Sequence, residues 1–320
     1  MSYRNICILG GTGFVGQHLA TRLTRHGYKV RVLTRHRERY RALIVNPDIA
    51  LLEADIHDPG VLRTHLAESD AAINLVGILN EGNSAGAGFD RIHVELPRKI
   101  IDAATAVGME RLLHMSALNA AAGETRSRYL KTKGLAEDLV HAAAASGMRV
   151  TSFRPSIIFG PGDSFFNRFA TLLRFSPPVF PLACPDSRFA PVCVTDVAEA
   201  FCRGLDDATA GERLELCGPE TWTLKELVEY TRDQIGVRRC IVGLGDGLSQ
   251  LQARILGYVP GKPFTMDNYY SLQKDSVCTT DGLASLGISP APIAAVVPGY
   301  LAERHTRGRY HEMRRWSRRT

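Results

Sequence analysis

Short apolar runs alternate with amphipathic stretches over the first half of the chain. The runs have the length and punctuation of buried strands, and the stretches between them carry apolar residues at helical spacing. The predicted strands are Asn5–Leu9, Lys29–Leu33, Ile49–Glu53, Ala71–Val76, Arg111–Met115 and Arg149–Phe153. The predicted helices lie near Val15–His26, Val61–Ala67, Phe89–Ala106 and Tyr129–Ser146.

This alternation predicts an α/β fold of the Rossmann type, a doubly wound parallel sheet with right-handed crossovers and helices on both faces. After about residue 160 the rhythm changes, and prolines cluster over Ser176–Pro191, where neither a regular helix nor a central strand fits. Helices resume near Thr195–Leu205, Leu224–Ile235 and Leu248–Leu256. We therefore expect a nucleotide-binding domain over 1–160, completed by 188–218, a substrate lobe over 161–302 and a basic tail over 303–320.

A glycine-rich loop follows the first predicted strand directly and opens the first helix. Gly11, Gly13 and Gly16 fit the G-x-G-x-x-G spacing, and Gly10, Gly13 and Gly16 fit a looser variant. Glycines allow the tight turn and let backbone N–H groups approach a pyrophosphate at the helix N-terminus. The alternative is a plain strand-to-helix turn. The residues expected to contact a dinucleotide here are Gly10, Thr12, Gly13, Phe14, Val15 and Gly16.

The end of the second strand favours NADP(H) over NAD(H). An NAD site would place Asp or Glu there for the ribose hydroxyls. This chain has Thr34 and Arg35, with further arginines close by, and a guanidinium suits a 2′-phosphate. The alternative is that these arginines form a solvated loop. Asp55 and Ile56 are expected to cap the adenine, and Leu75, Val76 and Gly77 to pass close to the cofactor, although both sets also suit turns.

A serine, a tyrosine and a lysine form the candidate catalytic set. Ser116 ends the fifth strand, and Tyr129 and Lys133 stand at i and i+4 on the next helix, so they share a face that Lys131 does not. A neighbouring ammonium would lower the pKa of the phenol and suit it for proton transfer, while Ser116 would bind the same substrate oxygen. Taken alone, the Y-x-x-x-K spacing also suits a solvated helix start.

Composition and charge narrow the class of protein. No apolar run reaches the length of a membrane span, and the first strand begins too early for a signal peptide. The seven cysteines form no C-x-x-C pair and no metal-type cluster, so we expect reduced thiols and no metal. Seven arginines against two glutamates after residue 302 carry +5 of the net charge of +6. A near-neutral body gives little support to a nucleic-acid face, and the tail is either a frayed terminus or a contact for an anionic partner.

Several phrases together resemble a known family. "GGTGFVG", "AINLVGIL", "HMSALNA", "RYLKTK", "RPSIIFGPGDSFFNRFA" and "TDVAEAF" occur in the order found in atypical extended short-chain dehydrogenase/reductases, which are NAD-dependent epimerase/dehydratase-like. The branch is similar to the nucleotide-binding accessory subunit of mitochondrial complex I and its bacterial homologues. The resemblance implies bound NADPH, catalytic positions at Ser116, Tyr129 and Lys133, a 2′-phosphate contact at Arg35, and Pro155 beside the nicotinamide.

Two functions follow from these patterns. The first is an NADP(H)-dependent oxidoreductase acting on a hydrophobic carbonyl or hydroxyl compound, with quinone-related compounds among the candidates. The second is a non-catalytic NADPH-binding subunit of a respiratory or quinone-biosynthesis complex, associated with it or with a membrane through the basic tail. We expect a cytoplasmic protein in either case, with attachment at the inner face of the membrane left open, and no nucleic-acid partner.

Overall fold

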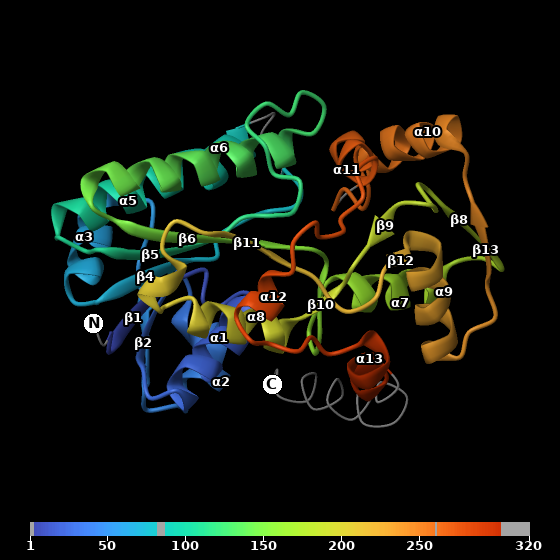
Figure 1. The fold of residues 1–320 in the computed structure, drawn as a ribbon. Helices are drawn as coiled ribbons and strands as arrows, with labels where there is room; N and C mark the ends of the chain where they lie inside the picture. Colours follow the sequence, from blue (N-terminus) through green and yellow to red (C-terminus); the bar gives the residue numbers. More distant parts are fainter. Residues whose placement is uncertain (1–2, 82–86, 260, 302–320) are drawn as a thin grey trace.

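The computed structural model describes residues 3–81, 87–259 and 261–301, so the basic tail lies outside the described residues. Within them, a seven-stranded parallel sheet has the strand order β11-β6-β5-β4-β1-β2-β3, that of a doubly wound α/β fold (Figure 1). The strands are β1 Asn5–Leu9, β2 Lys29–Thr34, β3 Ile49–Glu53, β4 Ala71–Asn74, β5 Arg111–Met115, β6 Arg149–Pro155 and β11 Arg213–Leu216.

Helices cover both faces of this sheet (Figure 1). On one face α3, α5 and α6 bury the side chains of one strand face in a core that includes Cys7, Leu112 and Val150. On the other face α1, α2 and α8 cover a second core that includes Ile8 and Phe153. Alternate residues of a strand face opposite sides of the sheet, and helices cover both sides, so the central strands are buried on both faces. The helices are α1 Phe14–Arg25, α2 Arg41–Ile44, α3 Pro59–Ala67, α5 Leu96–Ala106, α6 Arg128–Ala142 and α8 Val194–Arg203.

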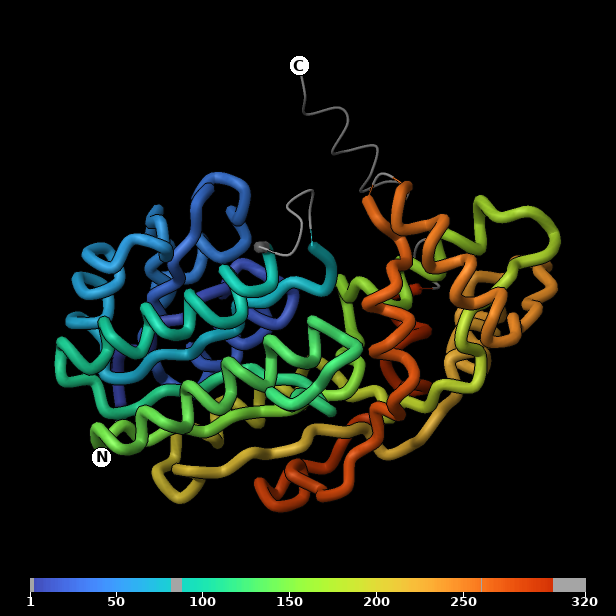
Figure 2. The backbone as a smooth tube through the Cα atoms, turned by 90° about the horizontal axis from the view of Figure 1, so that it is seen from above, coloured from blue at the N-terminus to red at the C-terminus, as the bar shows by residue number. Residues whose placement is uncertain are grey.

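A smaller lobe stands at the carboxyl end of the sheet, with its own core around Phe166 and Leu227 (Figure 1). Figure 2 shows the chain around α11 passing between this lobe and the sheet domain, where α11 contacts α6. The lobe's helices are α7 Phe165–Phe175, α9 Leu224–Ile235, α10 Asp246–Gly257, α11 Met266–Leu272 and α13 Ile293–Leu301. A further short helix, α12 Gly282–Ser285, packs against β11 of the sheet. Its short strand pairs are β7 Ile158–Phe159 with β10 Val192–Cys193, β9 Arg188–Phe189 with β12 Trp222–Thr223, and β8 Val179–Leu182 with β13 Cys240–Gly243.

One predicted helix is not a single regular helix. In place of one helix over Phe89–Ala106, the chain forms a short turn α4 Ala87–Phe89, a π-helix over Asp90–Glu95 and then α5. A π-helix carries an extra residue in its turn, which rotates the side chains on it relative to an α-helix, and such turns are frequent at functional sites.

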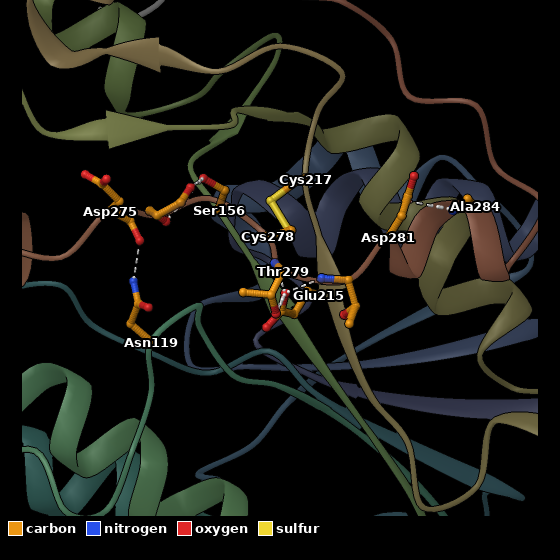
Figure 3. Close-up of a disulfide and its surroundings, with 11 residues drawn as sticks. Asn119, Ser156, Glu215, Cys217, Asp275, Cys278, Thr279, Asp281 and Ala284 are labelled. Carbon is orange, nitrogen blue, oxygen red and sulfur yellow. Dashed lines mark hydrogen bonds between the residues drawn. A yellow bond between two sulfur atoms is a disulfide. The ribbon is translucent and has the colours of Figure 1, made fainter.

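The expectation of reduced cysteines is wrong for one pair. Cys217, directly after β11, and Cys278 form a disulfide across 61 residues (Figure 3). The two segments already lie side by side, because the Glu215 carboxylate accepts the backbone N–H of Thr279 at 2.6 Å. No short spacing marks this pair in the sequence. Of the remaining cysteines, Cys7, Cys184, Cys193 and Cys202 are buried as expected of small core residues, and Cys240 is exposed.

Candidate functional site

The glycine loop at the start of α1 leaves a cradle of free backbone N–H groups. Gly10 has φ +83, a left-handed conformation that favours glycine, and the N–H of Gly13 donates to its carbonyl at 3.0 Å. A Cβ on Gly16 would lie 2.4 Å from the Cα of Gly11, so the helix packs against the loop too closely for any side chain. No side chain caps α1 and its first turn holds no acidic residue. The backbone N–H groups of Thr12, Phe14 and Val15, before and at the start of α1, can therefore hold a pyrophosphate, and the residues fit a dinucleotide.

The end of β4 meets this loop. A Cβ on Gly10 would stand 3.1 Å from the backbone of both Leu75 and Val76. The strand ends at Asn74 because its side-chain oxygen accepts the N–H of Val76 at 3.1 Å, which turns the chain. The predicted residues Leu75, Val76 and Gly77 thus lie beside the glycine loop at the carboxyl edge of the sheet.

Positive charges gather at the ends of β2 and β3. Arg35 is exposed just beyond β2, and Asp55 folds the turn after β3 by accepting the N–H of His57 at 2.9 Å. Burial lowers the pKa of His57, and Arg91 lowers it further against the opposing charge of Asp55, with smaller contributions from Lys99 and Arg35. The cations Arg91, in the π-helix, and Lys99, in α5, therefore lie near the same edge of the sheet as Arg35. Ile56 is partly buried against the adjoining core.

Ser116 presents a buried hydroxyl that no described residue satisfies. Its side chain is 3% exposed, and its Oγ makes no hydrogen bond within the described residues. Its backbone N–H donates to the Phe153 carbonyl at 2.8 Å, which fixes the residue at the end of β5. Buried hydroxyls are normally paired, so an orphan at a sheet's ligand edge points to a group that arrives with a ligand. Pro155 ends the neighbouring β6 and its carbonyl accepts the N–H of Leu118 at 3.2 Å.

Lys133 is buried on α6, whereas Lys131 is exposed, as their spacing predicts. The Nζ of Lys133 donates to the carbonyl of Met115 at 2.5 Å, next to Ser116. It also lies 3.7 Å from the position that a Cβ on Gly77 would take. Burial lowers the pKa of Lys133 to about 8, against the attraction of Glu137. The lysine therefore joins the Ser116 strand end to the loop after β4.

Tyr129 stands at the first turn of α6, but its phenol is not activated in the way its spacing suggests. Burial, and then the negative charge of Asp267, raise the pKa of Tyr129 to about 12. Lys133, which the spacing predicts to lower this pKa, is not among the described charges that act on it, and its nitrogen donates to the Met115 carbonyl. The phenol is held protonated.

His93, which the sequence gave no reason to select, lies against Tyr129. Its ring stacks on Phe89 with centroids 5.4 Å apart and meets the Tyr129 ring edge-on at 5.7 Å. Its Nε2 accepts the N–H of Ile78 at 3.1 Å, so Nδ1 carries the proton and donates to Thr132 at 3.0 Å. Burial, and then Lys133, lower the pKa of His93 to about 3. A neutral histidine thus ties the loop after β4 to the tyrosine's helix.

A second residue missed by the sequence patterns is Asp267, in α11 of the lobe. Its carboxylate accepts the backbone N–H of Arg128 at 2.5 Å, at the start of α6. The only signal for it was its place in the phrase "MDNYYSLQKDSV", which matches the family without giving a role.

An open cavity of about 1700 Å³ lies away from all these residues, at the amino ends of the strands. Asn5, Lys29 and Arg213, the first residues of β1, β2 and β11, line it. Next to it, His26, Glu199 and Cys202 bring possible metal-binding atoms within 4.8 Å of one another. Arg22 and Arg203 already bind the Glu199 carboxylate, at 2.7 and 2.8 Å, and their charges oppose a cation there. We read this group as an ion-pair cluster.

Comparison with known proteins gives the chain a family context. The model of the NAD dependent epimerase/dehydratase family matches residues 6–217. The mitochondrial NADH dehydrogenase [ubiquinone] 1 alpha subcomplex subunit 9 of Mus musculus is 28% identical over 296 residues, covering 89% of this chain and 76% of that protein. A ceramide reductase of Caulobacter vibrioides is 32% identical over 201 residues, covering 62% of this chain and 61% of that protein.

The solved structures support the fold. A double mutant of the dTDP-glucose 4,6-dehydratase DesIV of Streptomyces venezuelae, with NAD bound, superposes with a TM-score of 0.75 at 21% identity, covering 95% of this chain and 98% of that one. In the described part of this chain, every helix is too short or too polar to cross a membrane.

Proposed function

The chain belongs to the NAD dependent epimerase/dehydratase family, and we propose that within it the protein is an NADP(H)-dependent oxidoreductase that acts on a hydrophobic carbonyl or hydroxyl compound. The observation that carries the proposal is the buried, unpaired hydroxyl of Ser116 at the carboxyl edge of the sheet. Lys133 donates to the residue beside it, and Tyr129 lies one helical turn away on the same face. An orphan donor, an acid and a cation at one edge are the groups that a reacting carbonyl oxygen requires.

Each residue then has a distinct task. NADP(H), when bound in the glycine cradle, supplies or accepts the hydride. In the direction of reduction, Tyr129 gives its phenolic proton to the substrate oxygen as the carbonyl carbon gains hydride, and solvent restores the proton afterwards. Ser116 donates a hydrogen bond to the same oxygen and stabilises its developing charge. Lys133, whose pKa of about 8 leaves it largely cationic at neutral pH, stabilises the phenolate that proton transfer leaves behind.

The choice of NADP(H) over NAD(H) rests on charge. Arg35 follows β2 where an NAD site would have a carboxylate. Arg91 and Lys99 add positive charge at the neighbouring turn, since both contribute to lowering the pKa of His57. A 2′-phosphate carries the charge that such a cluster would attract.

The hydrophobic substrate is supported by a relative's name. The chain shares 32% identity over 201 residues with a protein named ceramide reductase, and a ceramide is a long-chain lipid. We propose a substrate of the same broad character, a long-chain or ring ketone, with quinone-related compounds as a second class. Oxidation of NADPH in the presence of a long-chain 3-oxo compound, a short water-soluble aldehyde and a quinone tests this. We expect the apolar compounds to be turned over faster than the aldehyde.

A non-catalytic role is the second candidate, and one observation favours it. The mouse complex I subunit matches 89% of this chain, and here the phenol of Tyr129, with a pKa of about 12, is far from activated. In that case NADPH would be a structural group. Slow exchange of bound nucleotide, with no NADPH oxidation by any compound of the panel, would establish this role and remove the enzymatic one.

A further inference from the structure

The first turn of α6 is capped by a carboxylate from another part of the chain. Ser127 caps the helix locally, accepting the N–H of Leu130 at 3.2 Å. Asp267 on α11 accepts the N–H of Arg128 at 2.5 Å and that of Tyr129 at 3.3 Å. The first N–H groups of a helix have no partner within it, and a negative charge is favourable there. A residue of the lobe thus completes the start of the helix that carries the candidate acid.

A second contact keeps Asp267 in place. The hydroxyl of Ser127 lies 3.3 Å from an Asp267 oxygen and 2.8 Å from the hydroxyl of Ser271, one turn further along α11. Thr265 and Asn268 form a capping box at the start of α11, so the helix that carries Asp267 is itself fixed at its first turn. The carboxylate therefore has few ways to rotate away from Tyr129.

We propose that Asp267 is a positioning residue for Tyr129, which fixes the start of α6 from the lobe and sets a negative charge against the helix turn that carries the phenol. The inference rests on the proposed function, because a negative charge beside Tyr129 opposes the phenolate that proton transfer would leave behind. It also assigns a task to the lobe, whose α11 would then influence how readily the tyrosine on the other domain gives up its proton.

The charges around Tyr129 support a specific role for Asp267. Lys133 faces the Met115 carbonyl, and His93 is neutral because its pKa is about 3. The cationic Arg128 is exposed and pairs with Asp90 at 2.9 Å. After burial, Asp267 is the one charge within the described part of the chain that acts on the pKa of Tyr129, and it raises that pKa because two negative charges side by side are unfavourable. Of the other titratable groups nearby, Glu81 accepts the N–H of Phe89, whose ring contacts that of Tyr129, and Asp90 pairs with Arg128, the residue before Tyr129.

The test reads the ionisation of Tyr129 without requiring turnover. The full chain would be labelled with 3-fluorotyrosine and titrated by fluorine NMR, with the Tyr129 signal assigned by its loss in Y129F. In D267N the amide oxygen can still accept backbone N–H groups, but the negative charge is gone. We expect the Tyr129 midpoint to fall by about one pH unit relative to the wild type. An unchanged midpoint overturns the proposal, whether or not the protein proves to be an enzyme.

Three further variants separate charge from folding. D267E keeps the charge and should keep a midpoint close to that of the wild type; an equal shift in D267E and D267N would mean that lost capping geometry is responsible and would overturn the electrostatic role. D138N removes an exposed carboxylate from the same helix and should leave the midpoint unchanged. If D267N does not fold, the comparison moves to D267S, whose hydroxyl can still cap α6, with the same expected fall. Where turnover is found, the limb of the pH profile assigned to Tyr129 should move with the midpoint.

Discussion

Two polar clusters, each built around a buried ionisable side chain, lie on opposite faces of the sheet and differ in how completely they are paired. Between α1 and α8, Glu199 accepts from Arg22 at 2.7 Å and from Arg203 at 2.8 Å, and lies 3.1 Å from His26. Burial alone would raise the pKa of Glu199, but Arg203, Arg22 and His26 outweigh it and hold that pKa at about 2. Every cation of this cluster contacts the Glu199 carboxylate, and the cluster joins α1 and α8, which cover the same face of the sheet.

The cluster around Tyr129 on the other face is incomplete. The Ser116 hydroxyl is unpaired among the described residues, and the pKa of Lys133 is lowered to about 8 while that of Tyr129 is raised to about 12. Burial without compensating partners causes the larger part of both shifts. A site that leaves polar groups unpaired and their pKa values displaced is suited to a ligand that completes it. Complete pairing accordingly marks a structural cluster, and incomplete pairing marks a candidate site.

Removing the phenolic hydroxyl should have the largest effect. In Y129F we expect kcat for a carbonyl substrate to fall by about 10²- to 10⁴-fold, because the proton donor is lost, while NADPH still binds. Steady-state kinetics and a binding titration measure the two quantities. E199Q is the matched control from the paired cluster and should retain the wild-type kcat. Equal losses of kcat in the two variants would remove the distinction between the clusters.

Reversing one charge at the end of β2 should have the next largest effect. In R35E we expect the Kd for NADPH to rise about 10- to 100-fold, because one charge-assisted contact with the 2′-phosphate is lost. The Kd for NADH should change little, because NADH lacks the 2′-phosphate. R25E makes the same charge change at the far end of α1, where the residue is exposed, and should leave both Kd values unchanged. Equal weakening of NADPH and NADH binding in R35E would argue against a 2′-phosphate contact.

The smallest expected effect concerns the stability that the paired cluster provides. E199Q should lower the free energy of unfolding at neutral pH by about 1–3 kcal/mol, since half-exposed partners limit the loss. The pKa of Glu199 is about 2 rather than 4.5, so its share of stability is present above pH 4.5 and is lost as the pH falls toward 2. Urea unfolding across that window should show a shallower pH dependence in E199Q. An identical slope in the two proteins would contradict the role given to this cluster.

The sheet was predictable because each strand is a short apolar run buried on both faces. All six predicted strands match within two residues, and β4 ends two residues early because Asn74 turns the chain. The candidate site was only partly predictable. Tyr129 and Lys133 share a helix face by local spacing alone, and Ser116 ends a strand.

The rest depends on tertiary structure. His93 reaches Tyr129 from a π-helix, a shape without a sequence pattern of its own. Asp267 caps a helix from 138 residues away in the chain, and Cys217 bonds Cys278 across a separation of 61 residues. The raised pKa of Tyr129 follows from burial and from the distant carboxylate of Asp267, and neither can be read from the local phrase "RYLKTK".

Isotope transfer tests the central claim most directly. The protein would be incubated with NADPH carrying deuterium at the transferred position and with the long-chain 3-oxo compound, and the product would be examined by mass spectrometry. We expect one deuterium on the reduced carbon of the product formed by the wild type, and almost no such product from Y129F. Nucleotide that stays bound and unoxidised, with no deuterium in any compound of the panel, would contradict it and leave NADPH as a structural group.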